Sequence, residues 1–339
     1  MESSRARRDR RAHPSRRRPL LRTALATVAV LGATAGGTVY VKAQAHSGTG
    51  AVSSSSSATP PASGSGSGKV SVETVAAPEV DHDALLASAL KSVTVPGDAA
   101  VSAAVLDLDS GDNATYGENA FDTASIVKVD ILATLLLQAQ DADRHLTTAE
   151  KTYATAMIEN SDNDSASALW RIIGKAEGLD AANERFGLTD TAGGDDMLWG
   201  LTQTTAADQL ILLQQVFGDD SELSEASRTY LKGLMGEIAV DQHWGVSAAA
   251  DGSSWALKNG WLARSTTGLW DINSIGRVTV DGHDCLVAVL SNGNATQTAG
   301  ISLVEQVAKA AVSAIRDGDA SASASASASA SASASPSAE

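Results

Sequence analysis

The sequence has very little of what several classes of protein need. It contains one cysteine, Cys285, in 339 residues, so no disulfide can form within the chain. The apolar run around Cys285 favours a small buried residue over a reactive thiol. The six histidines are scattered, and no histidine or cysteine pair has the spacing of metal ligands. We therefore expect neither a metal nor another cofactor.

Positive charge is also scarce outside the N-terminus. The formal net charge is −15, although residues 1–42 alone carry nine arginines and one lysine. The rest of the chain is therefore even more acidic than the total indicates. Because binding to phosphates requires clustered lysine and arginine, this composition predicts no nucleic-acid partner.

The N-terminus has the pattern of an export segment. Clustered arginines precede an uncharged apolar stretch, residues 23–41, that is long enough to span a bilayer. Two interpretations stay open: a membrane anchor, or a signal peptide cleaved after Ala43-Gln44-Ala45 and before His46. Ser15-Arg16-Arg17-Arg18 also resembles a twin-arginine signal, although Pro19 departs from that pattern. Each interpretation predicts an extracytoplasmic protein, either secreted or held at the cell membrane.

Both ends of the chain have low complexity. After the basic segment, residues 1–46, the Ser/Gly/Pro-rich residues 47–80 predict a flexible linker. Residues 317–339 form an Ala/Ser tail whose period of two is not a strand signal, because it has no apolar face to bury. Residues 81–316 are long enough for one domain of two lobes, which we expect to be monomeric.

Strand and helix patterns alternate within that domain. A hairpin is predicted over residues 101–117, and strands over 255–258, 274–280 and 285–290. Helices are predicted over 129–140, 164–173, 205–217 and 301–315, and a capping box formed by Thr147 and Glu150 opens another that ends near Glu159. Strands at both ends with helices between them predict an α/β (α+β) fold around one antiparallel sheet.

Three short motifs can carry chemistry. In Ser125-Ile126-Val127-Lys128, a spacing of three on a helix places hydroxyl and amine on one face, and burial can lower a lysine pKa enough for it to accept the serine proton. Ser161-Asp162-Asn163 lies in a polar turn between two helices, and is equally compatible with a simple helix cap. Lys258-Asn259-Gly260-Trp261 follows an inferred strand, and by itself it is typical of an Asn-Gly turn.

Taken in this order, the three motifs resemble the signature set of the penicillin-recognising serine enzymes. The chain is similar to class A beta-lactamases, and more closely to the actinobacterial serine hydrolases related to them. The resemblance implies a five-stranded antiparallel sheet flanked by helices, plus an all-helical lobe. It implies a small beta-lactam or a cell-wall peptide as substrate, and it implies a role for each site residue. Ser125 would be the nucleophile, Lys128 its base, Ser161 the proton relay and Lys258 the positive charge for a substrate carboxylate. Asn163, Asn259, Gly260 and Trp261 would bind substrate, and the N–H groups of Ser125 and Trp261 would form the oxyanion hole.

The chain departs from that family in three ways. Asn259 stands where a threonine is usual, and the interval from Ser125 to Ser161 is short, which predicts a trimmed helical lobe. Class A beta-lactamases use a loop glutamate and a water molecule to hydrolyse the acyl-enzyme. The corresponding stretch from Asp190 to Gln203 contains no glutamate, and its only carboxylates are Asp190, Asp195 and Asp196. Without a replacement base, the protein would bind penicillin covalently and turn over slowly.

Other functions therefore stay open. The missing glutamate favours a D-alanyl-D-alanine peptidase or an esterase that uses the same serine and lysine. A non-catalytic peptidoglycan-binding module is a further alternative, although the intact Ser125, Lys128, Ser161 and Lys258 argue against it. A Ser-His-Asp hydrolase is disfavoured, because the domain has no Gly-x-Ser-x-Gly elbow.

Overall fold

The computed structural model describes residues 80–332, with side chains described as far as Gly318. The predicted export segment, including residues 23–41, and nearly all of the linker lie outside the described residues, so the predictions about them stay predictions. Of the helices in the described part, none is both long enough and apolar enough to cross a membrane.

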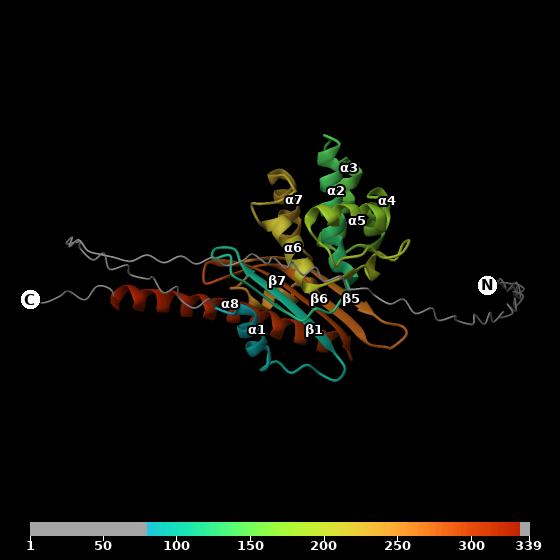
Figure 1. Ribbon diagram of the computed structural model, residues 1–339. Coiled ribbons are helices and arrows are strands. Elements are labelled where there is room, and N and C mark those ends of the chain that lie inside the picture. Colours follow the sequence, from blue (N-terminus) through green and yellow to red (C-terminus); the bar gives the residue numbers. More distant parts are fainter. Residues whose placement is uncertain (1–79, 333–339) are drawn as a thin grey trace, which may run out of the picture. The chain divides into compact units, whose positions relative to one another are not determined.

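A five-stranded antiparallel sheet forms the centre of the domain, as expected (Figure 1). Its strands lie in the order β2-β1-β7-β6-β5, so the first and last parts of the domain pair in the middle. The strands are β1 (Ala100–Asp107), β2 (Asn113–Tyr116), β5 (Trp255–Ala263), β6 (Trp270–Val280) and β7 (His283–Asn294). β5 is an edge strand, which leaves one of its sides free of strand partners.

Both faces of the sheet are covered, and the alternation of side chains along β7 explains its continuous apolar run. Leu286, Ala288 and Leu290 face one core, which includes residues of α2 (Val127–Asp141) and α6 (Ala206–Phe217). Cys285, Val287 and Val289 face a second core, with residues of α1 (His82–Leu90) and α8 (Gln297–Ala332). Figure 1 shows α1 and α8 on the side of the sheet away from α6 and α7 (Glu225–Gly236).

The remaining helices form the predicted helical lobe around α2. They are α3 (Thr148–Glu159), α4 (Asn163–Ile172) and α5 (Lys175–Phe186). The capping box is confirmed, because Glu150 N donates to Thr147 Oγ1 and Thr147 N donates to the Glu150 carboxylate. Asp162 is the cap of α4. The sequence patterns described above predicted neither α5 nor α7.

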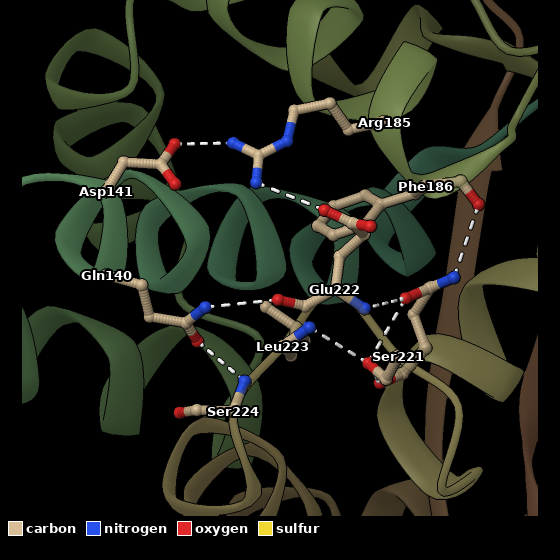
Figure 2. A network of polar contacts seen from close by, with 9 residues as sticks. Gln140, Asp141, Arg185, Phe186, Ser221, Glu222, Leu223 and Ser224 are labelled. Atoms are coloured by element: carbon tan, nitrogen blue, oxygen red, sulfur yellow. Dashed lines mark hydrogen bonds and ion pairs between the residues drawn. The ribbon is translucent and has the colours of Figure 1, made fainter.

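The C-terminal end of α2 is fixed to the loop before α7 by a polar network (Figure 2). Gln140 Nε2 donates to Glu222 O at 3.1 Å, and Gln140 Oε1 accepts from Ser224 N at 2.9 Å. Arg185 of α5 bridges Asp141 and Glu222. Because this network holds α2 at the end opposite Lys128, it helps to fix the position of that helix.

Several expected boundaries are wrong by four residues or more, and the two largest differences are at the ends of β5 and α8. β5 continues to Ala263, so Asn259 and Gly260 lie within a strand and do not form the expected turn after Lys258. Gly260 allows β5 to pack closely against residues 123–126. The terminal helix was expected to end near Ile315, but α8 continues to Ala332. Alanine has the highest helix propensity of all residues, which favours the continuation into the Ala/Ser segment.

Candidate active site

Ser125 lies on a single 3-10 turn, η1 (Ala124–Ile126), that leads directly into α2. Its preceding residue, Ala124, has φ of 48°, a left-handed conformation that costs a non-glycine residue about 1–3 kcal/mol. The turn is bonded to the sheet. Asn273 Nδ2 of β6 donates to Asp122 O at 2.9 Å and to Thr123 O at 3.0 Å. The strained turn that carries Ser125 therefore depends on a fully buried asparagine.

Lys128 lies one helical turn after Ser125 and is fully buried. Its amine donates to Ser161 O at 2.6 Å, to Ser161 Oγ at 3.0 Å and to Asn163 Oδ1 at 2.9 Å. Burial lowers the pKa of this amine from 10.5 to about 7, and the nearby charge of Asp162 opposes that shift only in part. Burial therefore favours the neutral amine near pH 7, a form that donates only two of these three bonds and whose lone pair can accept a proton.

In the described part of the chain, no hydrogen bond joins Ser125 Oγ to Lys128 Nζ, whose bonds go to Ser161 and Asn163. Contacts between a nucleophile and its base often tighten only when substrate binds. The assignment of Lys128 as the base for Ser125 therefore stays a prediction.

A second buried lysine, Lys258, also contacts Ser161. Lys258 Nζ donates to Ser161 Oγ at 3.1 Å and to Asn259 O at 3.0 Å, and lies 3.4 Å from Gln242 Oε1. Burial, and then the neighbouring Lys128, lower the pKa of Lys258 well below its usual value. Ser161 has φ of 55°, and its hydroxyl lies between the two amines. Ser125 is not in this network, but Ser161, Lys128, Lys258 and Asn163 are brought together.

Asn259 does not lie where a substrate could reach it. Its side chain is fully buried, and Nδ2 donates to Gln242 O at 2.8 Å and to Trp244 O at 3.0 Å. Both amide hydrogens are therefore used by the backbone of residues 242–244. Adjacent residues of a strand face opposite ways, so Lys258 and Asn259 cannot both point into one site. Asn259 positions this segment, and nothing in its geometry supports the substrate contact expected of it.

Gly260 allows the edge strand β5 to approach the turn that carries Ser125. A Cβ at Gly260 would lie 2.7 Å from Thr123 O and 2.9 Å from Ser125 N. Only a glycine therefore fits between β5 and the turn that carries Ser125. Trp261 follows on β5, and its ring packs against Trp244 with 6.0 Å between centroids. The two N–H groups expected to form the oxyanion hole thus belong to closely packed backbone segments.

The comparisons with known proteins agree with this architecture. A profile described as the beta-lactamase enzyme family matches residues 147–315, a range that contains Ser161 and Lys258 but not Ser125 or Lys128. A variant of PBP-A, solved as an acyl-enzyme complex with penicillin G, superimposes with a TM-score of 0.60 at 18% identity over 69% of this chain and 97% of that one. TLA-1 extended-spectrum beta-lactamase gives 0.59 at 16% identity over 68% and 96%. A class A beta-lactamase from Bacteroides cellulosilyticus gives 0.58 at 16% over 70% and 97%. No curated protein matches in sequence.

The chain has the fold of the serine beta-lactamase-like superfamily. At these identities the solved structures show the fold alone. The expected closer similarity to actinobacterial serine hydrolases stays a prediction.

In this superfamily fold, the loop before α6 places no carboxylate at the lysine. Asp190, Asp195 and Asp196 are exposed, and Asp196 pairs with Lys175 at 2.6 Å. The side chain that does reach Lys128 is Trp199, from the 3-10 turn η2 (Trp199–Leu201), whose ring centroid lies 5.0 Å from Lys128 Nζ. The short strands β3 (Phe121–Asp122) and β4 (Gln203–Thr204) pair with each other and so join this loop to the turn that carries Ser125.

Three residues of the site were not assigned roles from the sequence: Trp199, Gln242 and Asn273. The contacts of Trp199 and Asn273 depend on how segments far apart in the sequence meet. Gln242, in η3 (Val240–Gln242), is followed by η4 (Gly245–Ala249), and no sequence pattern marked its buried amide.

One group of possible metal ligands exists among the described residues. Asp107, Asp109 and His283 have ligand atoms within 4.8 Å of one another. Asp107 Oδ2 already accepts from Arg316 at 2.9 Å, and its Oδ1 accepts from Asp109 N at 2.8 Å. The buried carboxylate is thus neutralised by an arginine, and the group gives no reason to infer a metal.

Proposed function

We propose that this protein is a serine acyl hydrolase that forms an acyl-enzyme on Ser125 with beta-lactams or related amide and ester substrates. The observation that carries the proposal is the Ser161 hydroxyl held between two buried lysine amines, at 3.0 Å from Lys128 and 3.1 Å from Lys258. Burying two amines is costly, and such perturbed groups gather at functional sites. The penicillin G complex of the PBP-A variant supports the choice of ligand.

The proposed acylation uses these groups in sequence. Neutral Lys128 takes the proton of Ser125 Oγ, which attacks the carbonyl carbon of the substrate. The oxyanion is stabilised by the N–H groups of Ser125 and Trp261. Ser161 then gives its proton to the leaving nitrogen as the C–N bond breaks, and Lys128 returns a proton to Ser161. The products are an ester at Ser125 and a released or tethered amine.

Intact-protein mass spectrometry tests this proposal. The purified domain is mixed with benzylpenicillin and sampled from seconds to hours, beside Ser125→Ala and the exposed surface control Ser313→Ala. We expect one adduct of the mass of penicillin on the wild type and on Ser313→Ala, and none on Ser125→Ala. Absence of any adduct, together with absence of hydrolysed drug, would contradict the proposal that beta-lactams acylate Ser125 and would favour the binding-module or esterase alternative.

A second candidate function is a D-alanyl-D-alanine peptidase of the penicillin-binding type. It is favoured by the exposed positions of Asp195 and Asp196, which leave Lys128 without a carboxylate that could activate water. Release of D-alanine from a peptide ending in D-alanyl-D-alanine would support it. Rapid penicillin hydrolysis without peptide cleavage would support the lactamase instead.

We also propose that the enzyme acts outside the cytoplasm, on the basis of the arginine-rich N-terminus and the apolar residues 23–41. Fractionation of cells that express the full chain tests this. Recovery in the membrane or the medium is expected, and recovery only in the cytoplasm would contradict it. The N-terminal sequence of the recovered protein separates an anchor from a cleaved signal.

A further inference from the structure

A polar pocket lies beside the turn that carries Ser125, near the end of β5 that is farther from Lys258. The pocket has a volume of about 440 Å³, and the polar side chains of its wall include Asp122, Gln203, Arg264, Thr266, Asp271 and Asn292. Asp122 precedes Ser125 by three residues, and Arg264 directly follows β5. The pocket therefore borders the proposed active site, although no step of the proposed acylation uses it.

The charges of the pocket do not balance. Of the described residues that line it, Arg264 alone is basic, whereas Asp122 and Asp271 are acidic. The Arg264 guanidinium pairs with the Asp122 carboxylate, which also accepts a hydrogen bond from Gln203 Nε2. Arg264 Nη1 lies 3.7 Å from Asp271 Oδ2, which is beyond hydrogen-bond distance. Because two carboxylates share one guanidinium, the pocket keeps one uncompensated negative charge when both acids are ionised.

Asp271 is the acid that lacks a hydrogen-bond partner. It is only 5% exposed, and in the described part of the chain no hydrogen bond reaches its carboxylate. Burial raises the pKa of this carboxyl to about 6, and the charge of Arg264 opposes that shift while the charge of Asp122 adds to it. Asp271 is therefore mostly ionised near pH 7. Burying a carboxylate without hydrogen bonds is unfavourable, and a cation in the pocket would offset that cost.

The face of β5 that carries Lys258 also leads to this pocket. Side chains at alternate positions of a strand point the same way, so Lys258, Gly260 and Arg264 share one face. The pairing with β6 extends just beyond the strand, because Arg264 N donates to Leu269 O at 2.8 Å. Gly260, in the middle of this face, packs against the turn that carries Ser125. Lys258 and Arg264 therefore lie on opposite sides of the nucleophile along one strand.

This arrangement indicates which part of a substrate would reach the pocket. At about 3.3 Å per residue, Lys258 and Arg264 each lie roughly 10 Å along β5 from Trp261, whose N–H is proposed to bind the oxyanion. Lys258 contacts Ser161, the proposed proton donor to the leaving nitrogen. Because the leaving group extends toward Lys258, the acyl group of the substrate extends toward Arg264 and the pocket.

We propose that Asp122 and Asp271 form an acidic subsite that binds a positively charged group on the acyl side of the substrate. This inference rests on the proposed acyl-enzyme at Ser125 and names a substrate class: acyl donors that carry an ammonium several bonds beyond the reacting carbonyl. The ammonium donates hydrogen bonds to the Asp271 carboxylate, while Asp122 stays paired with Arg264. An uncharged acyl chain of the same length lacks this contact, and a carboxylate is repelled by the excess negative charge.

Matched penicillins test this inference. 6-Aminopenicillanic acid is acylated with straight chains of several lengths, each ending in an ammonium, a methyl group or a carboxylate, and adduct formation near pH 7 is followed by mass spectrometry. At the chain length that reaches Asp271, the wild type should react about tenfold faster with the ammonium chain than with the methyl chain, the effect of one hydrogen bond to a charged group. In Asp271→Asn the two rates should be equal. The control Asp241→Asn removes an exposed carboxylate next to Gln242, near Lys258, and should keep the wild-type ratio.

A second measurement needs no variant. The charged groups that face Asp271 are Arg264 and Asp122, and the pKa of Asp271 is about 6, so near pH 5 most of its carboxylate is protonated. The preference of the wild type for the ammonium chain should then fall to about twofold or less. Taking the ratio of the two rates removes the titration of Lys128, which affects both penicillins equally. A merely structural role for Asp271 does not predict this loss of preference.

Equal rates with the ammonium and methyl chains at every length in the wild type would overturn the inference alone. The fastest reaction with a carboxylate chain would also overturn it, because Arg264 would then be the group that binds the ligand. Absence of any adduct, with benzylpenicillin as well, would overturn the proposed acyl-enzyme and the inference with it. Thermal melts identify a variant that fails to fold, in which case the wild-type ratio near pH 5 decides.

Discussion

Replacing Asn273 by alanine should loosen the turn that carries the nucleophile. The Asn273 amide donates to Asp122 O at 2.9 Å and to Thr123 O at 3.0 Å, and its Oδ1 accepts from Ser291 N at 3.1 Å. The side chain is fully buried, so water cannot replace these bonds without rearrangement. At about 1 kcal/mol for each hydrogen bond, Asn273→Ala should lower the free energy of unfolding by about 3 kcal/mol.

A loss of this size should be easy to measure. In a domain of 150–250 residues, 1 kcal/mol shifts the melting temperature by about 2–4 °C, so Asn273→Ala should melt about 6–12 °C lower than the wild type. The matched control is Asn292→Ala on β7, which removes a half-buried asparagine that makes none of these bonds.

Asn273 is a positioning residue, so its effect on chemistry should be distinguishable from its effect on stability. At a temperature where the variant is fully folded, the maximal rate of penicillin adduct formation should fall, while the concentration for half-maximal rate stays similar. That split is expected because the turn orients Ser125 but does not bind the substrate. A melting temperature within about 2 °C of the wild type, with an unchanged maximal rate, would refute the reasoning.

Two further predictions concern buried groups. Burial raises the pKa of Asp130 to about 7, so between about pH 4 and pH 7 the folded state holds a proton that the unfolded state has lost. Stability should therefore fall as pH rises from about 4 to about 7, by on the order of 4 kcal/mol in all, and urea unfolding of Asp130→Asn should not show that fall. Gly260→Ala places a methyl group 2.7 Å from Thr123 O and should nearly abolish adduct formation, whereas Gly233→Ala on α7, with open space around it, should not. Normal acylation by Gly260→Ala would contradict the close approach of β5.

Much of the fold follows from local sequence signals. The capping box at Thr147 and the continuous apolar run of α2 identify their helices because the signal and the structure lie in the same few residues. α5 is different: its apolar side is interrupted by Gly178 and flanked by polar residues, and it becomes a helix through packing against α2. Local pattern does not contain that information.

The site shows the same division between local and long-range information. The spacing of Ser125 and Lys128 on one helical start could be derived from the sequence, and so could the polar turn at Ser161. The error at Asn259 and Gly260 has a clear cause: Asn-Gly is typical of a turn, but here the glycine permits contact with a turn from far along the chain. Trp199 reaches Lys128 only because the loop is bonded to Thr123, which sequence spacing cannot show.

The two buried lysines imply a role for a negative charge on the substrate. Lys128 and Lys258 share the Ser161 hydroxyl, and the charge of Lys128 disfavours a proton on Lys258. A substrate carboxylate near Lys258 would stabilise its ammonium form and thereby leave Lys128 as the neutral amine, free to accept the Ser125 proton. Binding of an anionic substrate would thus increase the neutral fraction of Lys128, the proposed base.

This coupling is testable through the pH dependence of acylation. Because Lys128 must be neutral to act, the rate should rise with pH through a midpoint near 7, the value to which burial lowers its pKa. For an anionic substrate such as benzylpenicillin, the midpoint should lie lower than for an uncharged ester, because the ammonium on Lys258 is then stabilised. In Lys258→Met the two midpoints should coincide. If the two midpoints already coincide in the wild type, the charge of the substrate does not change the pKa of Lys128 through Lys258, and the two amines titrate independently.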